Sequence, residues 1–349
     1  MTTVSQTNLA ALTKKEGLIL ESIKIPSKNN PLKPEFPPNN PRFPATPTYK
    51  INIPYFTNVW MKDESFNPTG THKDRMAWEM VVTYRDLLIA KSNDRIEKLP
   101  QLSIISSGSA ANAIQTMLKK YKLPNLKVLV DYKIHQKTKK HLRKIGCEIY
   151  ETDLSRKPLY TDEILRLTNN LNGIDITSDD SLGPNTRFYD WMSYEIINNS
   201  PDYCFIPYGS GHLYENILNI NKTEVSTNNG HDPRFKGDTK ELSHCHFMGA
   251  TTNNPDSLAD KLYSPHLPFV HFNEQWLQVF RTKGYCGNKS DVYVLQERYL
   301  KQAIRLAKKI GVHCEPSGIA GLGLLLQMKN SIPKDAKIVI VNTGLNKMK

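Results

Sequence analysis

The stretch that decides the fold runs from position 62 to position 75 and reads Lys62-Asp63-Glu64-Ser65-Phe66-Asn67-Pro68-Thr69-Gly70-Thr71-His72-Lys73-Asp74-Arg75. A short apolar run, Val59 to Met61, precedes it, and an amphipathic pattern from Lys73 to Ala90 predicts a helix after it. A loop of small and polar residues therefore delivers one lysine to a helix N-terminus. Imine chemistry needs an amine that is held in place and has a lowered pKa, and proximity to a helix N-terminus helps through the dipole. A lone lysine at a helix start is usually a solvated surface residue, but the complete string is far more specific.

A second segment joins the predicted strand 102–105 to the predicted helix 112–121. It reads Ser106-Ser107-Gly108-Ser109-Ala110-Ala111-Asn112-Ala113. Backbone N–H groups and hydroxyls converge at such a turn, which suits an anion. Taken alone, the segment is better read as an ordinary strand-to-helix turn that serine caps.

A third segment has the same position relative to the predicted strand 203–207 and the helix after it. It reads Pro207-Tyr208-Gly209-Ser210-Gly211-His212-Leu213. Its glycines let the backbone approach a phosphate closely, and the helix dipole then favours the bound anion. The turn matches neither the dinucleotide fingerprint nor the Walker A pattern, so by itself it is weak evidence.

A fourth segment consists of two stretches near the C-terminus. They read Glu315-Pro316-Ser317-Gly318-Ile319-Ala320-Gly321-Leu322 and Val341-Asn342-Thr343-Gly344-Leu345-Asn346-Lys347. Each places a hydroxyl beside a glycine at the edge of a predicted element.

Apolar runs alternate with helical patterns along most of the chain. Strands are predicted at 59–61, 102–105, 126–130, 147–151, 203–207, 245–250 and 338–342. Helices are predicted at 73–90, 112–121, 135–145, 162–170, 191–198, 295–311 and 318–329. This alternation favours an α/β fold with largely parallel sheets. Residues 1–50 are expected to be irregular, and residues 219–292 to be rich in loops.

Together and in this order, the four segments resemble those of the tryptophan-synthase-β-like enzymes, the fold type II family that uses pyridoxal 5'-phosphate (PLP). The resemblance extends from Thr46 to Lys347 and is closest in style to threonine synthase. The residues that carry this likeness are Asn67-Pro68-Thr69-Gly70, Lys73-Asp74-Arg75, Tyr194-Glu195-Ile196, Ser257-Leu258-Ala259-Asp260 and Thr343-Gly344.

The resemblance implies a role for each segment. Lys73 would hold PLP as a Schiff base and then shuttle protons at the α- and β-carbons of the substrate. The cofactor phosphate would be bound by Gly209, Ser210, Gly211 and His212. Thr343 would hydrogen-bond the pyridine nitrogen, with Ser317 as the lesser candidate, and a neutral hydroxyl keeps that nitrogen largely unprotonated. The substrate carboxylate would be bound by a loop that contains Ser106, Ser107, Gly108, Ala110 and Ala111.

Two positions depart from the family pattern. Members usually carry asparagine where this chain has Ser109, and serine has a shorter reach and one polar atom fewer. Ser109 would then contact the cofactor differently, or Asn112 would reach in from the next turn. Threonine synthases also tend to carry Arg and a Gly-Gln-Lys-Thr run before the Glu-Ile pair, but this chain reads Arg187-Phe188-Tyr189-Asp190-Trp191-Met192-Ser193. The signature for homoserine phosphate as substrate is therefore missing.

The family fold predicts two lobes, each a mostly parallel twisted sheet flanked by helices, with PLP in the cleft between them. The large PLP-binding lobe is expected to contain residues 1–76 and 176–349, including an irregular arm at 1–45. The smaller, mobile lobe is expected at 77–175.

Composition and charge indicate which classes of macromolecular partner to expect. The net charge of +12 arises from 46 Lys and Arg against 34 Asp and Glu. These charges are scattered and accompany no nucleic-acid motif, so we expect a solvated basic surface and no nucleic-acid partner. No apolar run is long enough to span a membrane, and the N-terminus has no apolar leader pattern, so a cytoplasmic protein without a membrane partner is expected. The five cysteines form no CxxC pair and are expected to be inert thiols.

A metal site is not expected. The motif His244-Cys245-His246, with His231, His266 and His271, resembles a metal site in composition, but no carboxylate spacing completes it.

The sequence therefore predicts a PLP-dependent lyase or transferase. The expected reaction is elimination or replacement at the β- or γ-carbon of a small amino acid, with threonine-synthase-like chemistry, a homodimeric state and, given the departures, a role in a specialised pathway. Two alternatives stay open within the fold: a cysteine-synthase-like β-replacement and an amino-acid dehydratase. A third is a catalytically silent homologue that binds PLP for regulation.

Overall fold

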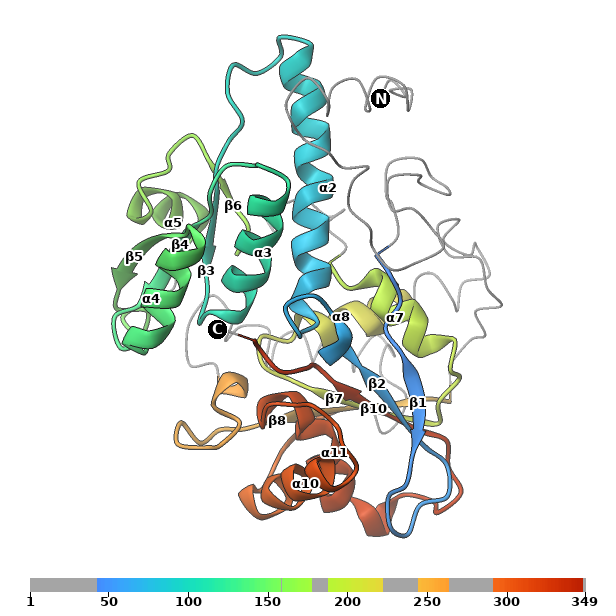
Figure 1. Cartoon of the computed structure of the whole chain (residues 1–349). Helices are drawn as coiled ribbons and strands as arrows, with labels where there is room; N and C mark the ends of the chain where they lie inside the picture. The colour runs from blue at the N-terminus through green and yellow to red at the C-terminus, as the bar shows by residue number, and fades with distance from the viewer. Residues whose placement is uncertain (1–42, 158, 178–187, 222–243, 264–290, 348–349) are drawn as a thin grey trace. The chain divides into compact units, whose positions relative to one another are not determined.

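The computed structural model describes residues 43–157, 159–177, 188–221, 244–263 and 291–347. The chain forms two compact units, which are considered separately (Figure 1). Unit 1 contains, among the described residues, 43–44 and most of Lys73–Phe188, and unit 2 contains Ala45–His72 and the described parts of Tyr189–Lys347. The predicted division of the chain into residues 77–175 and the remainder stays a prediction.

Unit 1 is built on a four-stranded sheet with the strand order β5-β4-β3-β6. All its pairings are parallel. The strands are β3 (Leu102–Ile105), β4 (Lys127–Asp131), β5 (Glu148–Thr152) and β6 (Ile174–Asp175). The helices are α2 (Lys73–Ser92), α3 (Ser109–Lys120), α4 (Gln136–Ile145) and α5 (Thr161–Leu167), and α2 packs along α3.

Unit 2 is built on a six-stranded sheet with the order β1-β2-β10-β7-β8-β9, in which only β1 pairs antiparallel. The strands are β1 (Thr48–Ile51), β2 (Val59–Asp63), β7 (Tyr203–Pro207), β8 (His246–Thr251), β9 (Asp291–Val294) and β10 (Ile338–Asn342). The helices are α7 (Asp190–Ile197), α8 (His212–Asn219), α10 (Glu297–Lys309) and α11 (Ala320–Gln327). Short 3-10 turns are η2 (Glu64–Phe66), η4 (Asp260–Leu262), η5 (Ser317–Ile319) and η6 (Lys329–Ser331).

The sheet of unit 2 has helices on both faces, α10 and α11 on one and α7 and α8 on the other (Figure 1). Every residue of the central strands β7 and β10 is buried, because a parallel strand covered on both faces reads as a continuous apolar run. Helix α10 contributes Leu300, Ala303 and Ala307 to the core at helical spacing, and α11 is buried over most of its length.

The prediction of an α/β fold with mostly parallel sheets is confirmed. Strands β3, β7 and β10 begin and end where the sequence predicts, and most other predicted elements agree within a few residues. The prediction that residues up to 50 are irregular is wrong at Thr48–Lys50, which belong to β1, paired with β2. Strands β6 and β9 were not predicted. Helix α3 begins at Ser109 instead of Asn112, because Gly108, with a positive φ of 129°, already ends the turn.

Several sequence predictions lie outside the described residues, among them most of the N-terminal arm, the stretches 222–243 and 264–290, and the residues His231, His266 and His271. Among the described residues, no group of three or more His, Cys, Asp and Glu side chains is arranged to hold a metal ion. Within the same residues no helix is both long and apolar enough to cross a membrane.

The cysteines that the structure describes are free, and burial raises the pKa of each thiol. The pKa of Cys147 rises to about 12 and that of Cys314 to about 11, where the carboxylates of Asp63 and Glu315 add to the effect of burial. At pH 8, a thiol with the pKa of Cys314 is ionised in about one molecule in a thousand.

We therefore predict slow alkylation at pH 8 in a Cys286→Ser background, with partly exposed Cys314 modified before Cys147, Cys204 and Cys245. Peptide mapping by mass spectrometry measures the order. Modification of Cys204 as fast as that of Cys314 in the folded protein would contradict the burial described here.

Candidate active site

Three neighbouring strands of unit 2 bring the predicted loops to one edge of the sheet. Strands β2, β10 and β7 lie side by side and run parallel, so their C-terminal ends, at Asp63, Asn342 and Pro207, point the same way. The loop before Lys73 follows β2, Thr343 follows β10, and the Gly209–Gly211 turn follows β7. Ligands of open α/β sheets bind at this edge. The topology therefore gathers three of the four segments around one position.

The loop that leads to Lys73 is fastened to the C-terminal loop by backbone hydrogen bonds. Leu345 N donates to Gly70 O over 2.8 Å, Lys347 N to Thr69 O over 3.2 Å, and His72 N to Thr343 O over 3.1 Å. We call this set of bonds the loop staple. His72 directly precedes Lys73, the predicted cofactor lysine. The loop staple therefore joins the residue next to Lys73 to Thr343, the predicted contact of the pyridine nitrogen.

Two glycines make the loop staple possible. Gly344 has a φ of 105°, and a Cβ atom there would lie 2.0 Å from Gly70 O. A Cβ atom on Gly70, whose φ is 87°, would lie 2.4 Å from Leu345 O. Neither position accepts a side chain without separating the two loops.

Both candidate hydroxyls for the pyridine nitrogen lie beside the loop staple. Thr343 and Ser317 are buried, and Thr343 N donates to Gly318 O over 3.1 Å. A Cβ atom on Gly318 would lie 2.5 Å from Gly344 O, so η5 and the C-terminal loop are in close contact. The structure brings the two hydroxyl residues together and does not choose between them.

The turn after β7 has the donor chemistry that a phosphate requires. Gly211 takes a φ of 90° and precedes α8, and no side-chain cap closes that helix end. The first-turn N–H groups of α8 and its positive dipole end therefore face the turn. Ser210 Oγ lies 3.3 Å from His212 Nδ1, which adds a hydroxyl and an imidazole. The predicted residues Gly209–His212 thus fit the PLP phosphate.

The predicted carboxylate-binding segment belongs to unit 1, where it follows β3 and opens α3. Ser106 Oγ accepts hydrogen bonds from Gly108 N at 3.1 Å and from Ala111 N at 3.3 Å. Ser109 and Ala110 are half-buried in the first helical turn, and Ser107 is exposed. Because α3 starts early, Ala110 and Ala111 lie in the helix and not in a loop. The N-cap residue of α3 is Gly108, which has no side chain, but the Ser106 hydroxyl accepts from Ala111 N in the first turn, as expected of a turn that serine caps.

Asn112 and Lys73 have distinct surroundings in unit 1. The Asn112 Oδ1 atom lies 2.8 Å from His141 Nε2 on α4, and the side chain is buried. Lys73 is the first residue of α2 and is half-buried. The chain passes from unit 2 into unit 1 between His72 and Lys73.

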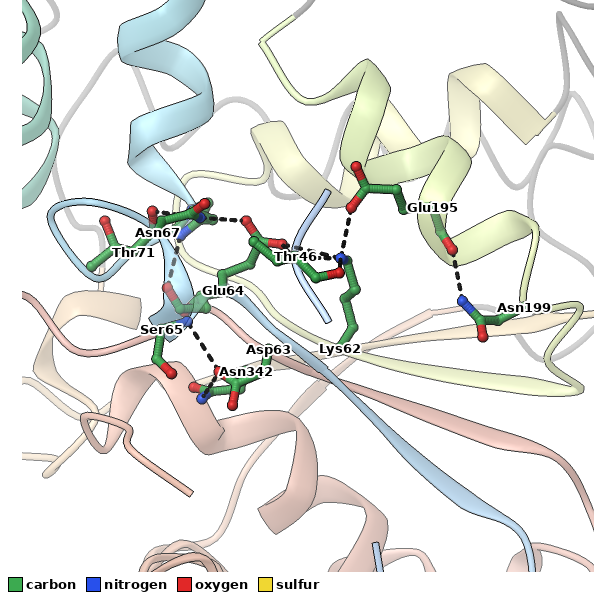
Figure 2. Close-up of polar contacts among 12 residues, drawn as sticks. Thr46, Lys62, Asp63, Glu64, Ser65, Asn67, Thr71, Glu195, Asn199 and Asn342 are labelled. Carbon is green, nitrogen blue, oxygen red and sulfur yellow. Dashed lines mark hydrogen bonds and ion pairs between the residues drawn. The ribbon is translucent and has the colours of Figure 1, made fainter. Parts of the chain in front are cut away.

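A buried polar network supports the loops, and sequence reasoning missed it (Figure 2). Asp63 Oδ1 accepts from Ser65 N at 3.0 Å and from Asn342 Nδ2 at 2.8 Å, and Asp63 Oδ2 accepts from Tyr49 Oη at 2.7 Å. Asn342 Oδ1 in turn accepts from Gly344 N at 3.0 Å. This network joins the end of β2 to the end of β10. Its signal in the sequence is a polar residue at the end of each strand, Asp63 and Asn342. These two residues are partners in the register of β2 and β10.

A family model described as "Pyridoxal-phosphate dependent enzyme" matches residues 43–344 of the chain. Among curated proteins, threonine synthase from Synechocystis sp. (strain ATCC 27184 / PCC 6803 / Kazusa) is 21% identical over 316 residues, which cover 88% of this chain and 76% of that protein.

Solved structures share the fold at low identity. O-ureido-L-serine synthase aligns with a TM-score of 0.59 and 14% identity over 87% of this chain and 90% of its own. The O-acetylserine dependent cystathionine β-synthase from Helicobacter pylori aligns with a TM-score of 0.58 and 15% identity, covering 87% of this chain and 93% of its own. The expected PLP fold type II architecture is thereby confirmed.

The phosphate fit can be tested with a matched pair of glycines. Gly211→Ala and Gly311→Ala both force alanine into a left-handed conformation, at a cost of about 1–2 kcal/mol in folding stability. A Cβ atom on Gly211 would lie 3.0 Å from Tyr208 Oη, whereas one on Gly311 meets nothing within 4 Å. We predict that Gly211→Ala weakens PLP binding roughly tenfold or more, as expected when about 1.4 kcal/mol of phosphate binding is lost.

PLP titration of the apoprotein, followed by absorbance, measures the affinity, and thermal unfolding measures stability. Gly311→Ala should lower stability similarly and leave PLP affinity unchanged. Equal PLP affinities in the two variants would place the phosphate elsewhere.

Proposed function

Because the chain belongs to the family of pyridoxal-phosphate dependent enzymes, we propose that it catalyses elimination or replacement at the β- or γ-carbon of a small amino acid. The observation that supports the proposal most is the loop staple. It holds the backbone next to Lys73 against Thr343, at the sheet edge where the phosphate-type turn also lies. The three groups that a PLP enzyme needs around one cofactor thus come from adjacent strands.

PLP, when bound, supplies the electron sink for the bond that is broken at the amino acid. The side chains supply the remainder. Lys73 would hold the cofactor and would move protons at the α- and β-carbons of the substrate, for which its place beside a rigid loop is suited. Gly209–His212 bind the phosphate and fix the cofactor in position. The segment Ser106–Asn112 binds the carboxylate of the substrate at the N-terminus of α3.

The threonine-synthase-like reaction is our first choice. The curated threonine synthase covers most of this chain, although at 21% identity. The stretch from Arg187 to Ser193 lacks the Gly-Gln-Lys-Thr signature, which argues for a substrate other than homoserine phosphate and for a role in a specialised pathway. Phe188, Tyr189 and Trp191 stand at that place and are buried, as side chains packed in a core are.

Two other reactions follow from the same site. A cysteine-synthase-like β-replacement is the first alternative; the fold shared with O-ureido-L-serine synthase and cystathionine β-synthase is compatible with it and supports the architecture alone. An amino-acid dehydratase would need the same lysine and no incoming nucleophile. A silent, regulatory homologue is disfavoured because Lys73, the Gly209–His212 turn and Thr343 are all present. A homodimer in the cytoplasm stays the family-based prediction.

The test is a substrate panel. We expect the purified protein to absorb visible light as lysine-bound PLP and to change its spectrum with one class of amino acid, O-acylated, O-phosphorylated or free. Product analysis with and without an added thiol separates replacement from elimination. Lys73→Ala should lose the visible band and all turnover while its far-ultraviolet circular dichroism stays unchanged. A borohydride-stable adduct on another lysine would reject Lys73, and a wild-type protein inert to the whole panel would favour the silent homologue.

Thr343 and Ser317 can be told apart by charge. A carboxylate beside the pyridine nitrogen stabilises its protonated form and so raises the pKa of that nitrogen. We predict that Thr343→Asp diverts turnover toward transamination, measured as keto-acid release, whereas Ser317→Asp does not. The opposite result would assign the nitrogen contact to Ser317.

A further inference from the structure

Helix α7 makes polar contacts with two different parts of unit 2. Toward α8, Asn216 Nδ2 donates to Asp190 Oδ1 over 2.9 Å, and Ser193 Oγ donates to Asn216 Oδ1 over 2.5 Å. Toward β2, Glu195 Oε2 lies 2.6 Å from Lys62 Nζ. One short helix therefore contacts both the phosphate-side helix and the strand that leads to the Lys73 loop.

Lys62 is a charged residue of β2, between β1 and β10, and its side chain is fully buried (Figure 2). Its Nζ donates to Thr46 O over 2.7 Å and also to Thr46 Oγ1, and it lies 3.6 Å from Glu64 Oε1. Glu64 is as buried as Lys62, and the side chain of Glu195 is 7% exposed. A buried ion pair of this kind is a poor source of stability compared with apolar packing, but it holds its members in one geometry.

The contacts continue from Glu64 to the loop before Lys73. Asn67 Nδ2 donates to Glu64 Oε2 over 2.7 Å and to Thr71 O over 3.0 Å. Thr46 Oγ1 donates to the other oxygen of the same carboxylate, Glu64 Oε1, over 2.5 Å. Asn67 thus spans the loop from its first turn to the carbonyl two residues before Lys73, and Figure 2 shows the chain of contacts from Glu195 to Asn67.

The loop has little freedom to adapt if these contacts are lost. On its other side the loop staple fixes Gly70 against Leu345, and the His72 ring lies 5.3 Å from the ring of Tyr189, the N-cap of α7. The loop end therefore lies between the contacts that lead back to Glu195 on one side and the loop staple on the other. Misplacement of a reacting group by about 1 Å can slow its reaction about a hundredfold.

We propose that Glu195 is a positioning residue for Lys73, acting through Lys62, Glu64 and Asn67. The inference rests on the proposed function, because it presumes that Lys73 carries the cofactor. It assigns to α7 a task beyond packing: the helix sets the loop that presents the reactive amine.

The experiment compares full-length Glu195→Leu and Glu195→Gln with wild type by hydrogen–deuterium exchange and by the rate at which PLP attaches to the apoprotein. Leucine removes the Glu195 carboxylate that lies beside Lys62 Nζ, whereas glutamine keeps an oxygen acceptor in the same place. We expect Glu195→Leu to speed amide exchange in residues 66–72 and to slow growth of the visible band roughly tenfold. Glu195→Gln should restore much of both. The total amount of PLP bound to Glu195→Leu, counted whether or not it contributes to the visible band, should stay near that of the wild type.

Leu300→Val is the matched control, because Leu300 is a buried core residue of unit 2 on α10 and makes none of these contacts. It should lower the unfolding temperature without changing either loop readout. Equal effects of Leu300→Val and Glu195→Leu on loop exchange, or none in Glu195→Leu, would overturn the proposal.

Asn67→Asp provides a second variant if Glu195→Leu does not fold. It keeps the shape of Asn67 but removes both donated hydrogen bonds and faces the Glu64 carboxylate, so it should speed exchange of the same loop; unchanged exchange would overturn the proposal. Failure of the proposed function would give a different result. A visible band that survives in Lys73→Ala would assign the cofactor to another lysine, and it would not alter the measured hydrogen–deuterium exchange of residues 66–72.

Discussion

The contact between Gly70 and Gly344 is the constraint on which the site depends. It lets two loops from opposite ends of the chain lie backbone to backbone, and the hydrogen bonds from His72 to Thr343 and from Leu345 to Gly70 then fix their register. Any side chain at either glycine would separate the loops. The placement of Thr343 relative to the residue before Lys73 is therefore a backbone property, independent of side-chain rotamers.

Below this contact, buried polar side chains take the place of apolar packing at the end of β2. Asp63 and Asn342 join the two strand ends, although they are 279 residues apart in the chain. Lys62, Glu64 and Glu195 form a second set on the neighbouring side. Loss of one member of such a buried set costs about 3–5 kcal/mol of folding stability, since it leaves a charge without its partner. The buried polar residues that carry this cost lie at the end of β2, next to the loop whose geometry they fix.

Much of this arrangement can be predicted from sequence, and the limit lies where long-range packing begins. Strand β7 is apolar throughout and β10 is apolar up to its last residue, Asn342, so local pattern determines both strands. The motif around Lys73 predicts the cofactor and the fold family. The contact between Lys62 and Glu195 could not be predicted, because nothing local shows that these residues of β2 and α7 meet. Strand β1 was missed for a related reason: its four residues lie beside a Pro- and Asn-rich stretch and gain their order from pairing with β2.

The carboxylate segment shows how the early start of α3 changes the chemistry expected there. Gly108 N and Ala111 N donate to Ser106 Oγ, so the Ser106 oxygen accepts two bonds and its hydroxyl proton is still available as a donor. The amides of Ser109 and Ala110 lie in the first turn of a twelve-residue helix, at its positive end. A carboxylate at this place would meet the Ser106 hydroxyl and the helix end together. In this proposed arrangement Ser109 would contribute through its backbone amide, and we predict that its short side chain leaves room for a bulkier substrate group than asparagine would.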